Sequence, residues 1–335
     1  MGNFTNFSNG VASFGHPLLP NGLFGKNSKA FFVNPADGSD GHDGRTPTKA
    51  LATVTKALSL CTDKQGDVIY LLNDGNTSGT SRDTATIAWS LDNTHLIGVC
   101  APSMISQRAR ISPPTSATAI VTPQLTVSGN GNYFANVSLF EGTSEDTVDS
   151  ECVRVTGSRN VFKNVAMMNM GDVTNGHSGD QADSCHLKIS GGEENLFQHC
   201  YIGLDTAVRS NTNANVELVS AAARNVFEDC MFPMFSDGAS ADPFFVKIDG
   251  SGDIDRFVWF KRCLFYNAIN SAASAIAAAM TVHASCGGSV LLDYCTLMGV
   301  TNGEWAASTN ANIHINMPVP DSAQPAGGAA TTWST

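Results

Sequence analysis

Acidic side chains gather in two stretches of this chain, and their types could do chemistry. Two carboxyl groups flanking a glycosidic bond can cleave it, one as general acid and the other as nucleophile or base. The same side chains could bind Ca²⁺ or form a solvated acidic loop. If the chain is an enzyme, we expect Asp180 and Asp183 to be the catalytic pair; our first interpretation is the solvated loop, with no catalytic residue. The stretches contain Glu145, Asp146, Asp149 and Glu151, then Asp172, Asp180 and Asp183, with His177 and His186 nearby.

A third acidic group, Asp37, Asp40 and Asp43, places a carboxylate at every third residue. An EF-hand loop instead alternates its ligands and ends in a bidentate glutamate, so this spacing departs from that pattern. We therefore expect a structural turn rather than a metal site. The sequence predicts no metal and no cofactor.

Nine cysteines could suggest disulfides or zinc. There is no Cys-x-x-Cys pair, and no Cys/His pair has zinc spacing. Four cysteines occupy a repeated position that valine fills elsewhere, and free cysteine behaves as a small buried hydrophobic residue. We expect free thiols, as suits a protein folded in a reducing cytoplasm.

The elements that must position these residues come from a motif that recurs six times, about every thirty residues. The motif begins with an apolar–x–apolar triplet: residues 125–127, 153–155, 187–189, 216–218, 246–248 and 280–282. A bulky residue follows, namely Phe134, Phe162, Phe197, Phe227, Phe260 and Leu292. Three residues later come Val137, Val165, Cys200, Cys230, Cys263 and Cys295. Such a period indicates a solenoid, propeller or array.

The triplets alternate, which is typical of strands rather than of helical repeats, and the unit is too short for a four-stranded propeller blade. We predict a parallel β-helix with three strands per coil and an inward ladder of the Phe, Val and Cys positions. The three-residue step from Phe to Val or Cys needs a tight left-handed corner. The corner residues are Asn136, Asn164, His199, Asp229, Arg262 and Tyr294.

One outward column of the predicted coils carries charges. It is the row in which a lyase would place a basic catalytic residue, but a charge ladder is the simpler interpretation, because Glu217 falls between Lys188 and Lys247. Arg154 is left unpaired in this interpretation. The column reads Thr126, Arg154, Lys188, Glu217, Lys247 and Thr281.

A solenoid end exposes its core and needs a cap. The stretch Thr48–Cys61 places Leu51, Val54, Leu58 and Cys61 on one helical face, with Pro47 as the first helical residue after Thr46. We expect this amphipathic helix to cap the N-terminal end. The predicted organisation is an arm (1–29), a first strand, loop and capping helix (30–65), the β-helix (66–318) and a tail (319–335).

Charge and hydropathy exclude several partners. The net charge of −11 argues against nucleic acid and anionic membranes, since both require basic clusters. No stretch of about twenty apolar residues predicts a transmembrane helix, and no signal peptide is expected. The four tryptophans, Trp89, Trp259, Trp305 and Trp333, are dispersed, which weakens the case for a sugar groove.

The segment 30–44, AFFVNPADGSDGHDG, followed by Thr46-Pro47, resembles the start of pectate-lyase-like right-handed β-helix proteins. That superfamily includes lyases, hydrolases and non-catalytic virion proteins, so the resemblance implies a right-handed single-stranded β-helix but no particular activity. Residues 9–20, NGVASFGHPLLP, resemble the leader of β-helix proteins encoded by tailed bacteriophages. This resemblance implies a phage virion protein and a homotrimer.

We therefore expect a structural virion protein, a capsid decoration or surface protein assembled in the host cytoplasm and displayed on the virion. Its partners would be the major capsid protein or other virion proteins. The alternatives are a tailspike-like polysaccharide depolymerase and a non-catalytic adhesin that binds a host surface glycan. The arm would dock through its apolar residues Phe4, Phe7, Phe14, Leu18, Leu19, Leu23 and Phe24.

Overall fold

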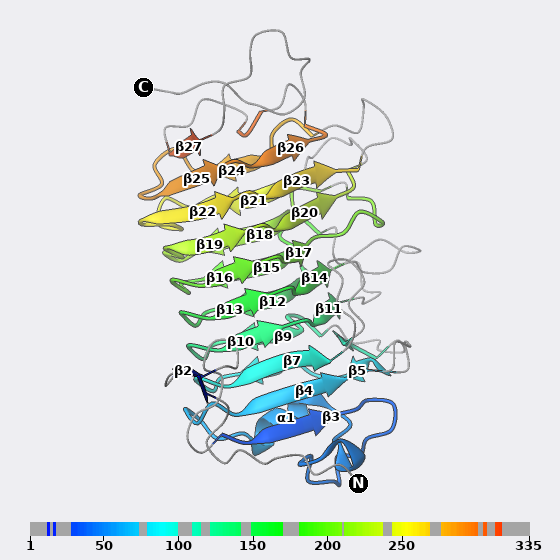
Figure 1. The fold of residues 1–335 in the computed structure, drawn as a ribbon. Helices are drawn as coiled ribbons and strands as arrows, with labels where there is room; N and C mark the ends of the chain where they lie inside the picture. The colour runs from blue at the N-terminus through cyan, green and yellow to red at the C-terminus, as the bar shows by residue number, and fades with distance from the viewer. Residues whose placement is uncertain are drawn as a thin grey trace.

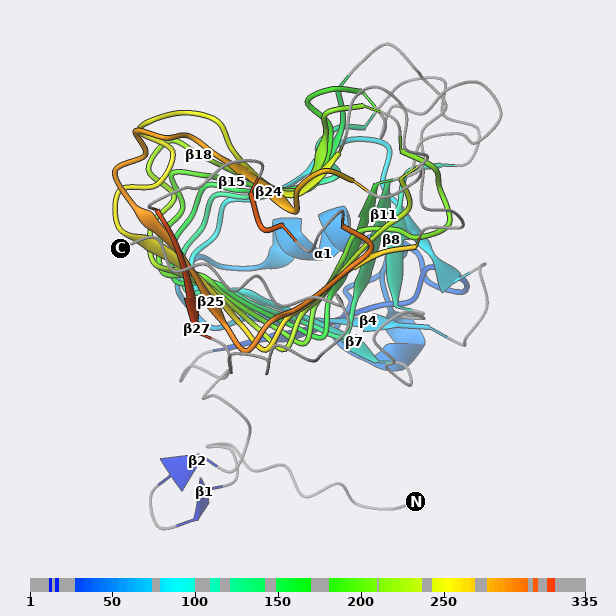
Figure 2. The ribbon, with the colours of Figure 1, turned by 90° about the horizontal axis from the view of Figure 1, so that it is seen from above.

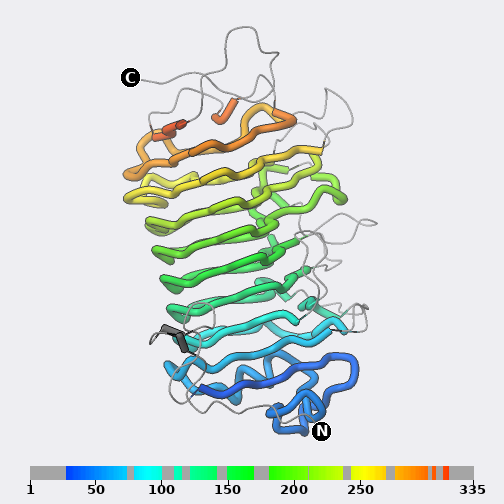
Figure 3. Tube along the Cα trace, in the orientation of Figure 1, coloured from blue at the N-terminus to red at the C-terminus, as the bar shows by residue number. Residues whose placement is uncertain are grey.

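The chain winds into a solenoid of stacked coils (Figures 1 and 3). The computed structural model describes residues 12–13, 16–17, 28–73, 79–99, 109–114, 121–141, 149–169, 181–209, 211–236, 243–268, 276–300, 304–306 and 312–316. Three parallel sheets line the solenoid, one strand from each per coil. The predicted all-β parallel β-helix is confirmed; its right-handedness stays a prediction. The predicted docking residues of the arm, and the tail beyond residue 318, lie outside the described residues.

Three sheets run along the solenoid, and each strand pairs in parallel with the equivalent strand of the next coil. The ten-stranded sheet contains β3 (Ala30–Val33), β4 (Val68–Leu72), β7 (His95–Val99), β10 (Tyr133–Ala135), β13 (Val161–Lys163), β16 (Leu196–Gln198), β19 (Asn225–Glu228), β22 (Phe257–Lys261), β25 (Ser289–Asp293) and β27 (Ile313–Asn316). The eight-stranded sheet contains β5 (Ser81–Arg82), β8 (Arg110–Ser112), β11 (Ser138–Glu141), β14 (Ala166–Asn169), β17 (Tyr201–Ile202), β20 (Met231–Met234), β23 (Leu264–Asn267) and β26 (Thr296–Met298). The seven-stranded sheet contains β6 (Ile87–Trp89), β9 (Leu125–Val127), β12 (Glu151–Val155), β15 (Cys185–Ser190), β18 (Ala214–Val219), β21 (Phe244–Ile248) and β24 (Met280–Val282). A separate antiparallel pair joins β1 (Ala12–Ser13) and β2 (His16–Pro17).

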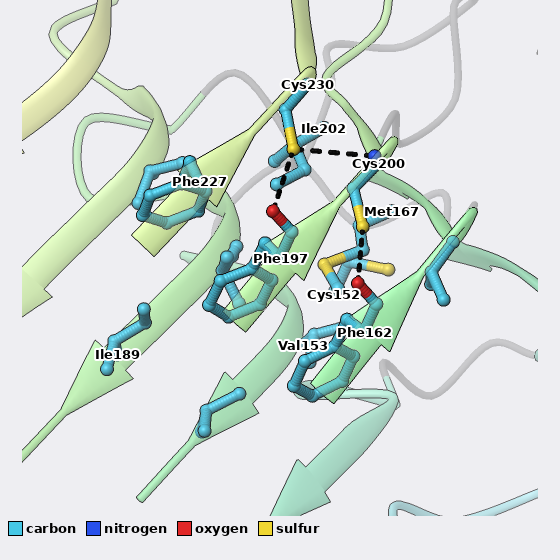
Figure 4. Close-up of a cluster of buried hydrophobic side chains, with 14 of the residues drawn as sticks. Cys152, Val153, Phe162, Met167, Ile189, Phe197, Cys200, Ile202, Phe227 and Cys230 are labelled. Carbon is cyan, nitrogen blue, oxygen red and sulfur yellow. Dashed lines mark hydrogen bonds between the residues drawn. The ribbon is translucent and has the colours of Figure 1, made fainter. Parts of the chain in front are cut away.

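The interior of the solenoid is a set of ladders in which like residues stack. Phe134, Phe162, Phe197, Phe227 and Phe260 are in register and fully buried, with adjacent ring centroids 4.6–4.8 Å apart. The spacing of adjacent parallel strands sets this distance. The ladder of Cys200, Cys230, Cys263 and Cys295 lies beside the rings, and Figure 4 shows part of both. The eight cysteines within the described residues are all free thiols.

The corner between the ten-stranded and eight-stranded sheets is left-handed in each coil that carries the motif. The six predicted corner residues have φ between 52° and 56°. Arginine and tyrosine adopt this conformation less readily than asparagine, so at Arg262 and Tyr294 the coil geometry overrides local preference. The corner explains the three-residue step from Phe to Cys.

The N-terminal cap differs from the predicted helix. A 3₁₀ helix covers Pro47–Lys49, and α1 begins only at Val54, ending at Leu60. Between them, Leu51 is fully buried and forms a parallel bridge with Val33. Thr53, not Thr46, caps α1 and accepts a hydrogen bond from the amide of Lys56. The prediction of one helix over Thr48–Cys61 was therefore wrong.

The shorter α1 still lies across the N-terminal end of the coils. Figure 2 shows it within the outline of the three sheets. Val54, Ala57 and Leu58 are its buried residues, and they belong to the main core cluster. No helix within the described ranges is long and apolar enough to span a membrane.

Candidate functional site: the charged face of the seven-stranded sheet

The outward face of the seven-stranded sheet carries a row of four ionisable side chains that the sequence singled out. Arg154, Lys188, Glu217 and Lys247 stand in one register on β12, β15, β18 and β21. Lys247 is only 8% exposed, so the row is partly shielded from water. Charges held this close and half-buried interact more strongly than freely solvated ones.

Arg154 is paired, contrary to the sequence interpretation. Its Nε and Nη2 donate to the two carboxylate oxygens of Glu151, each over 2.6 Å. Strict alternation would place Glu151 on the inner side with Val153. Cys152 and Val153, however, are both fully buried in the core, so alternation breaks between them and Glu151 turns outward. The hydrogen bond to Glu151 raises the pKa of Arg154.

The ladder continues from coil to coil through Lys188. Its Nζ lies 3.5 Å from Glu151 and 2.7 Å from Glu217, so it bridges two carboxylates. Burial disfavours the charged form of Lys188, but the hydrogen bond and attraction to Glu217 outweigh it and raise the pKa. The pairing of Glu217 with Lys188 agrees with the expected ladder.

Lys247 extends the network differently from the expectation. Its Nζ lies 2.8 Å from Asp183 and 3.6 Å from Asp249, and these are its ion pairs among the described residues. Asp183 comes from two coils earlier, 64 residues away in sequence. The sequence placed Glu217 between the two lysines; the structure gives Lys247 other carboxylates.

Asp183 is thus the described member of the suggested catalytic pair, and its carboxylate is an ion-pair partner. Its hydrogen bond to Lys247 lowers its pKa, and its side chain is 63% exposed. Asp180 lies outside the described residues, as do Glu145, Asp146, Asp172 and His177. A general acid needs a carboxyl pKa raised toward neutrality. Among the described carboxyls, the pKa is lowered at Asp63, Asp92, Asp183, Glu228 and Asp229.

His186 points inward, away from this face. It is fully buried; its Nδ1 accepts from the amide of Asn169 over 2.7 Å, and its Nε2 lies 3.0 Å from Nη1 of Arg209. Burial and the Arg209 charge lower the pKa of His186 well below its usual value. It is therefore a neutral structural residue of the core edge, not a partner of the acidic loop.

The Asp37/Asp40/Asp43 segment is organised as a turn. Asp40 accepts from the amides of Ala52 and Thr53 and from the Thr53 hydroxyl, over 2.9, 3.0 and 2.9 Å. Asp43 accepts from the amide of Arg45. Within the described ranges, no group of three or more His, Cys, Asp or Glu residues is placed to hold a metal ion.

The core edge also contains a ladder of buried asparagines that the sequence patterns did not predict. The backbone N–H groups of Asn132, Asn160 and Asn195 each donate to the side-chain oxygen of the asparagine one coil later, over 2.9–3.0 Å. The ladder ends at Asn225. All four are at most 1% exposed. The signal was an Asn two residues before each Phe from Phe134 to Phe227. The ladder fixes the turns into the ten-stranded sheet and has a structural role.

Comparisons with known proteins find only solved structures of low similarity. No family model and no curated protein matches the chain. A pectin methylesterase solved with a hexasaccharide is 15% identical, covers 87% of this chain and 80% of its own, and has a TM-score of 0.49. The Aspergillus niger pectin methylesterase is 13% identical over 93% and 92%, with a TM-score of 0.48. A pectate lyase is 13% identical over 85% and 78%, with a TM-score of 0.44. With TM-scores below 0.5 and identities of 13–15%, these matches carry no conclusion about this chain.

Proposed function

We propose that this chain is a structural virion protein of a tailed bacteriophage, a capsid decoration or surface protein that attaches through its N-terminal arm. The observation that carries the non-catalytic part is the ion-pair network on the seven-stranded sheet. The resemblance of residues 9–20 to phage leaders supports the virion part.

The network suits a structural role because it shifts the pKa values of its groups away from the range that acid–base catalysis needs. A catalytic acid or base works best with a pKa near the operating pH. Here the carboxyl pKa of Asp183 is lowered, while the pKa values of Lys188 and Lys247 are raised. All three therefore stay charged at neutral pH. Neighbouring opposite charges across strands stabilise a sheet, which is the role we assign to this face.

The arm is the proposed attachment element. The described solenoid starts at β3 and is capped by α1, so its first coil already has a cover built from residues after 29. In this proposal the seven apolar side chains predicted to dock, from Phe4 to Phe24, bind the shell or neighbouring virion proteins. A few ordered contacts of this kind can hold a subunit on a large assembly.

Deletion of residues 1–29 tests the proposal. The shortened chain should keep the circular dichroism and thermal midpoint of a folded solenoid and lose binding to particles that lack the protein. Deletion of residues 319–335 is the matched control and should retain binding. If the arm-deleted chain still binds particles, the attachment proposal is wrong.

A structure of the intact virion tests the location. Symmetric copies over the capsid, with residues 1–29 threaded into the shell, would support a decoration role. A few copies at the tail tip, together with release of oligosaccharides from host polysaccharide, would instead establish the tailspike-like depolymerase. Asp180→Asn and Asp183→Asn variants should abolish that release if these are its acids.

One observation favours a glycan-binding adhesin as a second candidate. A cavity of about 250 Å³ opens near the C-terminal end of the ten-stranded sheet, with Trp259, Leu291, Asp293 and His314 among its lining residues. An aromatic face beside polar groups suits a sugar, although the cavity is smaller than most ligand sites. Glycan-array binding that is lost in Trp259→Ala and kept in Trp305→Phe would support this function; no binding to any host glycan would exclude it.

A further inference from the structure

The outward face of the ten-stranded sheet carries an apolar stripe in two staggered segments. Its side chains point away from the core, because each stands next to an inward residue of the same strand. The stripe consists of Phe32, Tyr70, Ile97, Tyr133, Val161, Leu196, Val226, Trp259 and Leu291. All nine keep part of their surface exposed. The stripe is a partly exposed apolar patch, and contiguous apolar patches at the surface can mark an interaction site.

The stripe runs through nine successive coils. From Tyr133 to Leu291 the residues are direct neighbours in the parallel register. In the first three coils the stripe occupies the adjacent outward column, where Phe32 pairs with Tyr70 and Tyr70 with Ile97. The Phe32 and Tyr70 rings stack with centroids 5.5 Å apart. At about 4.8 Å per coil, the stripe is roughly 40 Å long, so its partner must be equally long.

We propose that this stripe is the contact surface between copies of this chain, arranged around a rotation axis parallel to the solenoid axis. A second copy is a partner whose apolar surface has the same length and spacing. With parallel axes, each coil lies level with the same coil of the other copies. Val161 then meets Val161, and Leu196 meets Leu196.

The charge pattern favours this arrangement over other partners. Near a rotation axis a residue meets its own copies, so a charged residue would face its own charge, which is destabilising. The stripe has no charged residue in nine coils. The adjacent outward column becomes charged from Lys163 onward, as does the face of the seven-stranded sheet. Charge is thus absent where symmetry would penalise it.

Among the flanking charges, Glu228, Lys261 and Arg262 pair with one another within the chain, which lowers the cost of burying them. Lys261 and Arg262 lie 3.0 and 2.8 Å from Oε1 of Glu228, and Gln198 donates to its Oε2. Lys261 also lies over the Trp259 ring, 5.5 Å from its centroid. Desolvating paired charges costs less than desolvating free ones.

The area of the outward face of the ten-stranded sheet indicates how tightly two copies should associate. Strands of three to five residues are roughly 10–17 Å wide, so the whole outward face, with the charged flanking column included, contributes on the order of 500 Å² per copy. This lies at the lower end for specific interfaces, which bury about 800 Å² per partner. We therefore expect association that depends on concentration.

Sedimentation equilibrium of the full chain tests the interface. The wild type should exceed the monomer mass at the highest soluble concentrations and shift toward monomer on dilution. The double variant Val161→Lys/Val226→Lys should remain monomeric with an unchanged circular dichroism spectrum. Thr126→Lys/Thr281→Lys adds the same charges on the seven-stranded sheet and should associate like the wild type. A wild type that is monomeric throughout would overturn the proposal, as would a stripe variant that associates normally.

Disulfide trapping tests the like-with-like geometry and does not depend on affinity. Leu196→Cys should form a disulfide-linked dimer on mild oxidation, because the two thiols meet across the axis. Thr126→Cys, on the other face, should stay unlinked. If Leu196→Cys stays reduced under conditions where the wild type associates, copies meet elsewhere, and the stripe belongs to another occupant such as residues 1–29 or a capsid protein.

Discussion

The thiol of Cys230 donates to the backbone carbonyl of Phe197 in the preceding coil, with Sγ 3.3 Å from the oxygen (Figure 4). The same bond joins Cys200 to Phe162, Cys263 to Phe227 and Cys295 to Phe260, over 3.3–3.4 Å. The two core ladders are therefore linked, each thiol reaching back one coil. This gives cysteine a weak hydrogen bond that valine at the same position lacks.

Replacing Cys230 by valine should cost less than about 1.5 kcal/mol of unfolding free energy. Valine already fills this ladder position at Val137 and Val165, so the coil accepts its β-branched side chain, and the substitution loses only a weak donor. Chemical denaturation measures the change. Phe197→Ala is the matched contrast and should cost about 3–5 kcal/mol because it leaves a cavity in the ring stack. Equal losses in the two variants would mean that the thiol bond, not the packing, dominates.

Stability should fall between about pH 6.5 and 4 because of buried His95. Burial lowers the pKa of His95 from 6.5 to about 4, with Asp67 opposing the shift. Its Nδ1 accepts from the amide of Tyr133. In this window His95 is protonated in the unfolded chain but stays neutral in the folded chain. The unfolding free energy therefore falls as the pH falls, by up to about 3 kcal/mol.

Denaturation midpoints at pH 7 and pH 4.5 measure this effect. The difference between the two midpoints should shrink in His95→Gln, whose amide oxygen can accept the same bond. Part of the difference should remain, because burial also lowers the pKa of His186. His283→Gln, at an exposed position, is the control and should behave as the wild type. An unchanged pH dependence in His95→Gln would contradict the assignment.

Glu151→Gln should lower the unfolding free energy by about 1–2 kcal/mol. The substitution keeps the shape but removes the charge that accepts from Arg154 and attracts Lys188. The Arg154 side chain is 41% exposed, so solvent screening keeps the loss below that of a fully buried pair. Thermal and urea denaturation measure it. Asp255→Asn, which breaks the exposed pair with Arg256, should change stability by less than about 0.5 kcal/mol. If Glu151→Gln lowers the unfolding free energy no more than Asp255→Asn does, the network contributes little to stability.

Asp40→Ala should destabilise the N-terminal cap by about 1–2 kcal/mol, because three donors around Ala52 and Thr53 lose their acceptor. Asp37→Ala, in the exposed part of the same loop, should have little effect. Neither Ca²⁺ nor a chelator should move the wild-type thermal midpoint. Stabilisation by Ca²⁺ that disappears in Asp40→Ala would instead identify a metal site.

Much of the coil could be predicted from the sequence, because its determinants are local. The alternating triplets give the strands, and the step from Phe197 to Cys200 requires a corner that only a left-handed residue can turn. Like residues recur because each coil rests on the next at a fixed spacing. The candidate site was less predictable. His186 was expected near the acidic loop but lies in the core edge, and Arg154 was expected to be unpaired but binds Glu151.

The sequence by itself determined the solenoid, its inward Phe and Cys ladders and its left-handed corners, since these follow from side-chain period and residue type. Tertiary structure alone decided which charges meet. Lys247 pairs with Asp183 across 64 residues, and Glu151 faces outward only because alternation breaks at Cys152 and Val153. Such contacts depend on the lengths of the intervening loops and on the stacking of whole coils. No local pattern of residues encodes either quantity.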